Sequence, residues 1–373
     1  MFTSPTGRLL PVWSFLLAAA FSAVAFFACT YVADAIAGDH ILRFEAVYRL
    51  LLAAALFGLY LWLLTVADQV EEHRIAVLGF PLVRGWIRQL AFGCLLGLLL
   101  TVLAVIPVAI CSDVAFHVPR FTSRSALRLA AVLVVLIFGA LAEELMFRGY
   151  PFQRLEEASG PIGAIGVFSV LFAAVHLSNP GAGALGLANT VLIGIVLAIA
   201  YLRTRALWLP LGIHFGWNAA LGLLLGLPVS GLHLFNVMIR TSAKGPQWLT
   251  GGEYGLEASV PGAVAVIIGV IVVWKWPVTR LGEPLTFPRP EVTTARSLSY
   301  VVLFLGSLPI AYWVWAVFSR LTSRSLDIGN AQGYVLIGLI VAAVGNPPGS
   351  VLIGLIVIAV GAVLWFVGRS ETQ

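Results

Sequence analysis

The chain has 373 residues, of which 60% are hydrophobic and 10% are charged, and its formal net charge at pH 7 is +5. So few charges on so long a chain exclude a soluble globular domain, and the modest positive charge predicts no nucleic-acid partner. The apolar runs are continuous for about 20 residues, whereas strands of a membrane β-barrel alternate apolar and polar positions. The composition therefore predicts an all-α, polytopic transmembrane helical bundle in a lipid bilayer.

Apolar runs of spanning length follow one another along the chain and predict about nine to ten spanning helices. The runs cover approximately residues 11–37, 46–67, 89–110, 127–147, 161–178, 184–202, 207–227, 260–276, 298–318 and 333–367. The last run contains a repeat, because Val335–Gly345 and Val351–Gly361 differ at one position. Each copy is too short to cross a bilayer alone, so a kinked span or a re-entrant hairpin is favoured over two crossings.

Composition divides the chain into three segments. Residues 1–74 are predicted to form N-terminal transmembrane helices, and residues 75–228 form a membrane core that holds every strong site signal. Residues 229–373 begin with a polar connection and are predicted to add C-terminal transmembrane helices. Between the second and third runs, Val70–Gln89 mixes charged and apolar residues, which is typical either of a segment along the membrane surface or of a solvated loop.

The distribution of Lys and Arg predicts the orientation in the membrane. If each run crosses once, more than half of the 22 Lys and Arg residues fall on the side of the N-terminus. The positive-inside rule assigns that side to the cytoplasm. We therefore predict a multi-pass protein of the cell membrane, with a retained first span and with the N-terminus and the Arg148 end of the fourth run in the cytoplasm.

The fourth run ends in two adjacent carboxylates, Glu143 and Glu144. An ionisable residue at that depth costs about 2.5–3.5 kcal/mol on insertion scales, so it indicates a functional site or a buried ion pair. Helix geometry allows both, because Glu144 and Arg148 are four residues apart and share a face, whereas Glu143 is rotated by about 100°. Glu144 is therefore predicted to pair with Arg148, which leaves Glu143 to face another partner.

Two histidines and an asparagine stand in later apolar runs. His176 lies in the fifth run, and His214 and Asn218 share one face of the seventh because they are four residues apart. Glycines beside both histidines are expected to let helix backbones approach closely. These are Gly160, Gly163 and Gly166 before His176, and Gly212 and Gly216 around His214. Three separate spans thus contribute groups that can transfer protons, bind a metal or donate hydrogen bonds.

Taken in order, these residues form three motifs that resemble those of a known family. The motifs are Glu143-Glu144-x-x-x-Arg148, Phe172-x-x-x-His176 and His214-x-x-x-Asn218. They are similar to those of the CPBP family of CAAX-processing and bacteriocin-processing intramembrane proteases, also called Abi or Rce1-like proteins. The resemblance covers residues 75–228, which would then form an Rce1-like helical core.

The resemblance implies an endopeptidase that cuts a membrane-embedded or lipid-anchored protein at a site opening to the cytosol. It implies that Glu143 and His176 activate the attacking water, and that His214 and Asn218 stabilise the oxyanion. The other motif residues expected to support the site structurally are Glu144, Arg148 and Phe172. The alternative is a transporter or bacteriocin-immunity protein that uses the same polar residues for binding.

The favoured interpretation requires no cofactor. Glu143, His176 and His214 could alternatively bind zinc as three ligands with a free position for water. The chain has no H-E-x-x-H motif, which would place two zinc ligands and a base on one helix. We therefore expect metal-independent catalysis and keep zinc as the alternative.

The predicted spans raise one geometric difficulty. A fifth helix that begins at the membrane surface near Pro161 would put His176 about 22 Å deep, against about 10 Å for Glu143 and His214. The motifs can share a cavity only if Pro151–Gly160 projects beyond the membrane and the fifth helix begins outside it.

Overall fold

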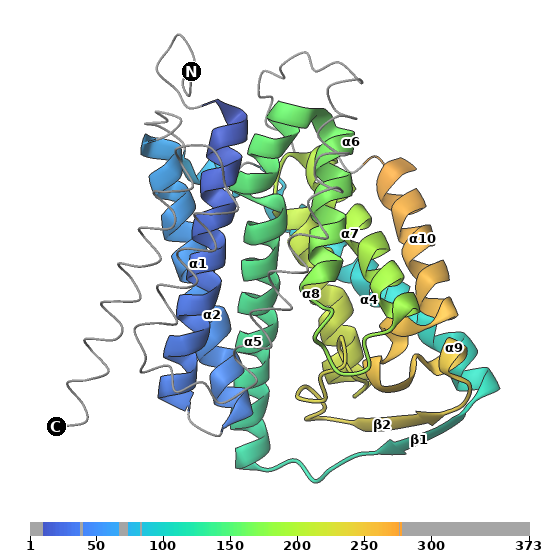
Figure 1. Cartoon of the computed structure of the whole chain (residues 1–373). Coiled ribbons are helices and arrows are strands. Elements are labelled where there is room, and N and C mark those ends of the chain that lie inside the picture. Colours follow the sequence, from blue (N-terminus) through green and yellow to red (C-terminus); the bar gives the residue numbers. More distant parts are fainter. Residues whose placement is uncertain (1–9, 38–39, 67–73, 83, 276, 278–373) are drawn as a thin grey trace, which may run out of the picture. The chain divides into compact units, whose positions relative to one another are not determined.

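The computed structural model describes residues 10–37, 40–66, 74–82, 84–275 and 277. The predicted spans at 298–318 and 333–367, and the repeat within the second of them, lie outside these residues. The described part is a bundle of helices with one small two-stranded sheet (Figure 1). The predicted all-α bundle is therefore confirmed, with this sheet as an addition.

The helices coincide with the predicted apolar runs, with two clear differences at their ends. They are α1 (Pro11–Ala37), α2 (Ile41–Val66), α3 (Arg74–Val77), α4 (Trp86–Cys111), α5 (Ser123–Arg148), α6 (Tyr150–Ala174), α7 (Ala184–Thr204), α8 (Trp208–Ala219), α9 (Gln247–Thr250) and α10 (Val260–Lys275). Helix α6 begins well before the run 161–178, and α8 ends well before the end of the run 207–227. Among the described residues, five helical stretches are long and apolar enough to cross a membrane: α1, α2, α4, α7 and the stretch formed by α5 and α6 together. The chain is a multi-pass membrane protein.

Helices α5 and α6 form a bent pair that resolves the difficulty over His176. Helix α5 ends at Arg148, and α6 starts after a turn at Gly149 and bends at Gly160, whose φ of +79° is easily adopted only by glycine. Counted from the bend at 1.5 Å per residue, Glu143 and His176 both lie roughly 25 Å away along the chain. The two side chains therefore reach the same level of the bundle from opposite sides of the bend.

Helices α4 and α8 cross with their backbones in contact. A Cβ atom added at Gly97 of α4 would lie 2.4 Å from the carbonyl oxygen of Ile213, and one at Gly216 of α8 would lie 2.4 Å from that of Cys94. The expected close approach beside His214 is thus present, with α4 as the partner helix. Gly166 differs from the expectation, because a Cβ there would have no neighbour within 4 Å.

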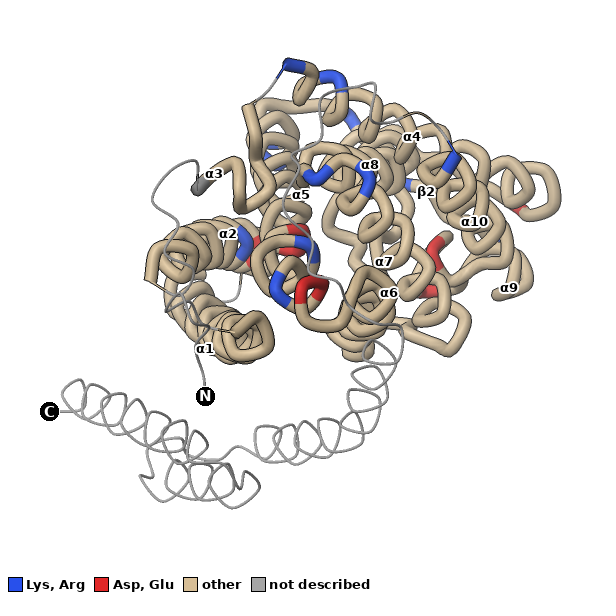
Figure 2. Tube along the Cα trace, turned by 90° about the horizontal axis from the view of Figure 1, so that it is seen from above, with Lys and Arg blue, Asp and Glu red and all other residues tan. Residues whose placement is uncertain are grey.

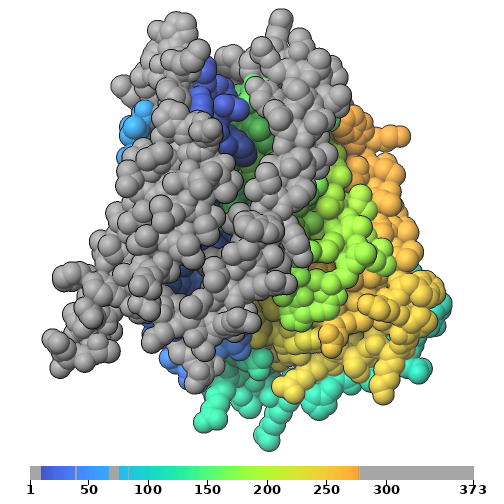
Figure 3. All heavy atoms as spheres, viewed as in Figure 1, coloured from blue at the N-terminus to red at the C-terminus, as the bar shows by residue number. Residues whose placement is uncertain are grey.

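A short sheet joins the connection after α4 to the segment after α8. Strand β1 (Asp113–His117) pairs antiparallel with β2 (Arg240–Lys244), so that Asp113 lies opposite Lys244. In the space-filling view the teal residues after α4 lie against the yellow residues that follow α8 (Figure 3). Helix α10 then packs on α4 and α7. Residues 229–275 thus pack directly on the predicted core. The boundaries between the three predicted segments, after residues 74 and 228, remain predictions.

The described part of Val70–Gln89 is buried in its middle, although Leu82 and Ile87 are exposed as expected of a segment along the membrane surface. Leu78 is fully buried, and the Phe80 ring packs edge-on against Trp208 at 5.1 Å. The indole nitrogen of Trp208 also donates a hydrogen bond of 2.9 Å to the carbonyl oxygen of Pro81. The middle of this stretch therefore packs into the bundle at the start of α8, because its apolar residues find partners there.

The glycine contact between α4 and α8 predicts the effect of a single methyl group. Gly97→Ala should force the two backbones apart and lower the free energy of unfolding by about 1–3 kcal/mol. Thermal unfolding in detergent measures the loss, and Gly166→Ala, which meets no neighbour, is the matched control. Equal stability of the two variants would contradict the close crossing.

The orientation can be tested with one native and one introduced cysteine. Ile162 is 75% exposed close to the Gly160 bend, so a cysteine introduced there is accessible to a reagent. The exposed Cys111 is the last residue of α4, and this end of α4 lies near β1, at the opposite end of the bundle from the start of α6 (Figure 1). If the Arg148 end is cytoplasmic, a membrane-impermeant thiol reagent should label Cys111 in intact cells. Ile162→Cys, in a Cys111→Ser background, should react only after permeabilisation; the reverse pattern would invert the orientation.

Candidate active site

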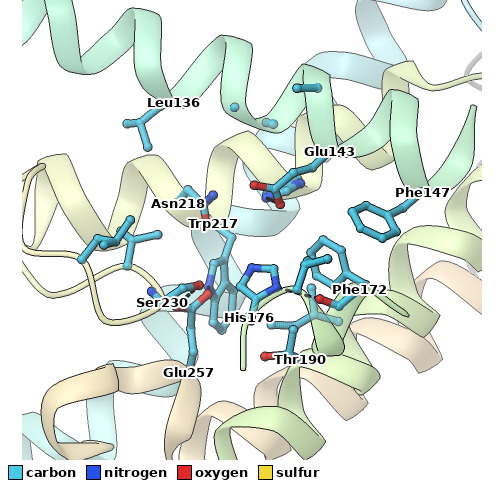
Figure 4. Close-up of a pocket in the computed structure, with 18 of the residues that line it drawn as sticks. Leu136, Glu143, Phe147, Phe172, His176, Thr190, Trp217, Asn218, Ser230 and Glu257 are labelled. Carbon is cyan, nitrogen blue, oxygen red and sulfur yellow. Dashed lines mark hydrogen bonds and ion pairs between the residues drawn. The ribbon is translucent and has the colours of Figure 1, made fainter. Parts of the chain in front are cut away.

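One cavity of about 300 Å³ is lined by all four residues predicted to be catalytic. Glu143 comes from α5, His176 follows the end of α6, and His214 and Asn218 lie on α8. Figure 4 shows Glu143 and Asn218 on one side of this cavity and His176 facing them. The fold thus brings the three motifs together, although more than 70 residues separate Glu143 from Asn218 in the sequence.

Both oxygens of the Glu143 carboxylate have a basic neighbour. Oε1 accepts a hydrogen bond of 3.4 Å from Nη1 of Arg49, which lies on α2. Oε2 lies 3.6 Å from Nε2 of His214. The view along the bundle shows acidic and basic residues meeting where α2 lies beside α5, within a largely uncharged molecule (Figure 2). Glu143 is therefore held in place from two helices while it still lines the cavity.

Glu144 is completely buried and turns away from the cavity. Its Oε1 accepts a hydrogen bond of 3.2 Å from Nη1 of Arg148, which is the pairing expected from their spacing, and another of 2.8 Å from Nδ1 of His214. Arg148 also donates to the carbonyl oxygen of Gly194, and its guanidinium lies 4.5 Å from the centre of the Phe172 ring. Glu144 therefore links the end of α5 to α7 and α8.

Hydrogen bonds fix the tautomers of both histidines. Nδ1 of His176 lies 2.7 Å from the carbonyl oxygen of Phe172. A carbonyl can only accept, so Nδ1 carries the proton, and Nε2 of a neutral ring is left free to accept one in the cavity. His214 likewise donates from Nδ1, to Glu144, and turns Nε2 toward Glu143. Both rings therefore direct the nitrogen that can exchange a proton toward the site.

Asn218 completes the predicted set from the last turn of α8. It lines the cavity half-buried, and its amide makes no hydrogen bond to the residues that the structure describes. A π-helical turn, Ala220–Leu224, follows it directly and ends the regular helix. The amide is thus available to donate to a group bound in the cavity.

Sequence reasoning missed several polar cavity residues outside the three motifs, and four of them make ion pairs or hydrogen bonds within the site. These four are Glu45 and Arg49 on α2, and Ser230 and Glu257 after α8. Arg49 carries a signal that could have found it, because a charge within the apolar run 46–67 is unusual, and Glu45 lies directly before that run. The other two lie in a polar connection, where a serine and a glutamate predict nothing in particular.

Glu257 anchors the far wall of the cavity. Its carboxylate accepts hydrogen bonds from the backbone N–H of Ser230, from the hydroxyl of the same serine at 3.0 Å and from the indole nitrogen of Trp217 at 3.1 Å. Ser230 has a left-handed φ of +46°, which non-glycine residues rarely adopt. Burial raises the pKa of the Glu257 carboxyl. The carboxylate therefore holds together a strained loop and the aromatic ring beside Asn218.

The residues of the alternative zinc site are not arranged as a preformed metal site. Among the described residues, no three His, Cys, Asp or Glu side chains are grouped so that they could hold a metal ion. His214 has Nδ1 on Glu144 and Nε2 toward Glu143, and a carboxylate on the second ring nitrogen is also common in metal-ligating histidines. Zinc therefore stays the alternative to metal-independent catalysis.

Fold and site define a multi-pass membrane protein with a glutamate and histidine cluster inside its helical bundle. Residues 125–220, from α5 to the end of α8, match a family model described as type II CAAX prenyl endopeptidase Rce1-like. This match confirms the resemblance for residues 125–220, which are similar to that family. No curated protein and no solved structure matches the chain.

The contacts of Glu257 predict a specific loss of stability. Glu257→Gln replaces one carboxylate oxygen, which accepts hydrogen bonds, by an NH₂ group, which can only donate. Because the group opposite is also a donor, a buried polar group is left without a hydrogen bond. The expected cost is about 1–3 kcal/mol of unfolding free energy. Glu253→Gln, the same change at an exposed position nearby, is the control. Equal melting temperatures for both variants would contradict an anchoring role for Glu257.

Proposed function

We propose that the protein is an intramembrane endopeptidase that hydrolyses a peptide bond of a membrane-embedded or lipid-anchored protein. The observation that supports this most is the convergence of Glu143, His176, His214 and Asn218 on one cavity inside a membrane-spanning bundle. A cavity within a membrane-spanning bundle fits a substrate that is itself held in the bilayer. A lipid-modified substrate also accords with the description of the matched family.

Glu143 and His176 act as the water-activating pair in this proposal. The Glu143 carboxylate and Nε2 of His176 both accept hydrogen bonds, so a water molecule between them is oriented by its two protons. Glu143 takes one proton as the water oxygen attacks the carbonyl carbon of the substrate. The same proton is then returned to the amine nitrogen as the carbon–nitrogen bond breaks, which restores the carboxylate and releases an acid and an amine.

His214 and Asn218 stabilise the charge on the tetrahedral intermediate. The free amide of Asn218 donates to the oxyanion without any change of protonation. His214 can donate from Nε2 only as the imidazolium, and the two carboxylates beside its ring, Glu143 and Glu144, stabilise that form. Glu144 acts through His214 and Arg148 and touches no reacting atom.

The division of roles between the adjacent carboxylates predicts two different phenotypes. Glu143→Gln keeps the shape of the side chain but removes the proton acceptor, so peptide cleavage should fall by about 10²–10⁴-fold with little change in melting temperature. Glu144→Gln leaves Arg148 buried without its charge partner, so the free energy of unfolding should fall by about 3–5 kcal/mol. Cleavage of a quenched fluorescent, lipid-modified peptide and thermal unfolding should be measured on the same detergent-purified preparations.

Several outcomes would contradict this assignment. Normal cleavage by Glu143→Gln, or abolished turnover in Glu144→Gln at an unchanged melting temperature, would refute the assigned roles. Activity that a chelator removes and added zinc restores would make Glu143, His176 and His214 metal ligands. Peptide binding without any cleavage by the wild-type protein would instead favour the transporter or immunity alternative.

A further inference from the structure

We propose that Arg49 is a positioning residue that holds the Glu143 carboxylate in the orientation in which it accepts a proton. The proposal rests on the endopeptidase function proposed above. Arg49 lies on α2, outside residues 125–220 that match the family model. Its contact with Glu143 therefore joins the matched part of the chain to a helix outside that part.

The contact is directed at one oxygen of Glu143. Nη1 of Arg49 lies 3.4 Å from Oε1, whereas Nε2 of His214 lies 3.6 Å from Oε2. The two partners approach from different helices, α2 and α8, and engage different oxygens of the same carboxylate. A carboxylate fixed at both oxygens has little freedom to rotate about its terminal bond, whereas one held only by His214 can turn.

Arg49 is itself fixed before it reaches Glu143. Its Nε donates a hydrogen bond of 2.8 Å to Oε2 of Glu45, one helical turn earlier on α2. Its guanidinium occupies a notch in α5 at Gly139, where an added Cβ would lie 2.3 Å from Nη1 and 2.9 Å from Cδ. Gly139 and Glu143 are four residues apart and share a face of α5. The helix that carries the carboxylate therefore also makes the space for the cation.

Two other roles for Arg49 agree less well with these contacts. A purely structural cation needs one carboxylate partner, and Glu45 already supplies it at the shorter distance. A residue that binds an anionic group of the substrate would stand clear of other carboxylates, whereas Arg49 lies between Glu45 and Glu143. Arg49 also lines the same cavity as Glu143.

The positioning role predicts a change in kcat and not in KM. An interaction made with the base, and not with the substrate, affects the chemical step and leaves substrate binding intact. Arg49→Gln should therefore lower kcat by about 10–100-fold and leave KM within about twofold, since the contribution of a correctly placed base is partly lost. Arg49→Lys should retain an intermediate rate, because an ammonium keeps the charge but lacks the fork that reaches two carboxylates.

A glycine substitution provides the second, independent test. Gly139→Ala leaves both Arg49 and Glu143 unchanged but fills the notch with a methyl group, so it should reproduce the loss of kcat. Gly58→Ala on α2, where an added Cβ has no neighbour within 4 Å, is the matched control for the methyl group. Arg43→Gln, the same charge removal at an exposed position of the same helix, is the control for Arg49→Gln.

The experiment measures kcat, KM and melting temperature for the full-length variants, together with an infrared spectrum of Glu143. The difference spectrum between the wild-type protein and Glu143→Gln isolates the bands of this carboxylate without any turnover. Arg49→Gln and Gly139→Ala should shift these bands, whereas Arg43→Gln and Gly58→Ala should not.

Each other outcome decides against one part of the argument. A raised KM at constant kcat would make Arg49 a substrate-binding residue and overturn the proposal. Unchanged kinetics and bands in Arg49→Gln, or equal losses in the two controls, would overturn it as well. If the wild-type protein cleaves no peptide but its Glu143 bands shift in Arg49→Gln, the endopeptidase function fails while the positioning of Glu143 by Arg49 stands.

Discussion

The buried carboxylate of Glu144 is the group on which the arrangement of the site depends. A lone charge in the interior of a membrane protein is strongly unfavourable, so it requires partners that are themselves fixed. Here Arg148 comes from the same helix and His214 from α8, and Arg148 continues to a carbonyl oxygen of α7. One carboxylate therefore joins three helices and also determines which nitrogen of His214 faces the cavity.

The neighbouring residue, Glu143, lies on another face of the same helix and lines the cavity. A step of one residue rotates a side chain by about 100°, so a helix that buries Glu144 must present Glu143 on another face. Only a bend such as that at Gly160 returns the chain so that His176 meets that face. The close crossing of α4 and α8 then keeps His214 and Asn218 beside it. The site is thus produced by helix geometry at short range and by glycine-dependent packing at long range.

Local geometry explains which features could be predicted from the sequence. The all-α bundle follows from continuous apolar runs, and the pairing of Glu144 with Arg148 follows from a spacing of four residues. Contacts between distant segments could not be predicted in this way. Arg49 and Glu143 are 94 residues apart, and Glu257 meets Ser230 only through the fold. The burial of Leu78 could not be predicted either, because a segment that mixes charged and apolar residues indicates a surface position when its packing partners are unknown.

The acidic and basic side chains of the site form a single row in which the two kinds alternate. In spatial order the row is Glu45, Arg49, Glu143, His214, Glu144 and Arg148. Glu143 lies inside this row, so a proton that it accepts removes one negative charge between two basic groups. The loss weakens the hold of Arg49 and makes the imidazolium of His214 less stable, which favours return of the proton. In the reaction proposed above, the base must release its proton within the same turnover, and such neighbours favour that release.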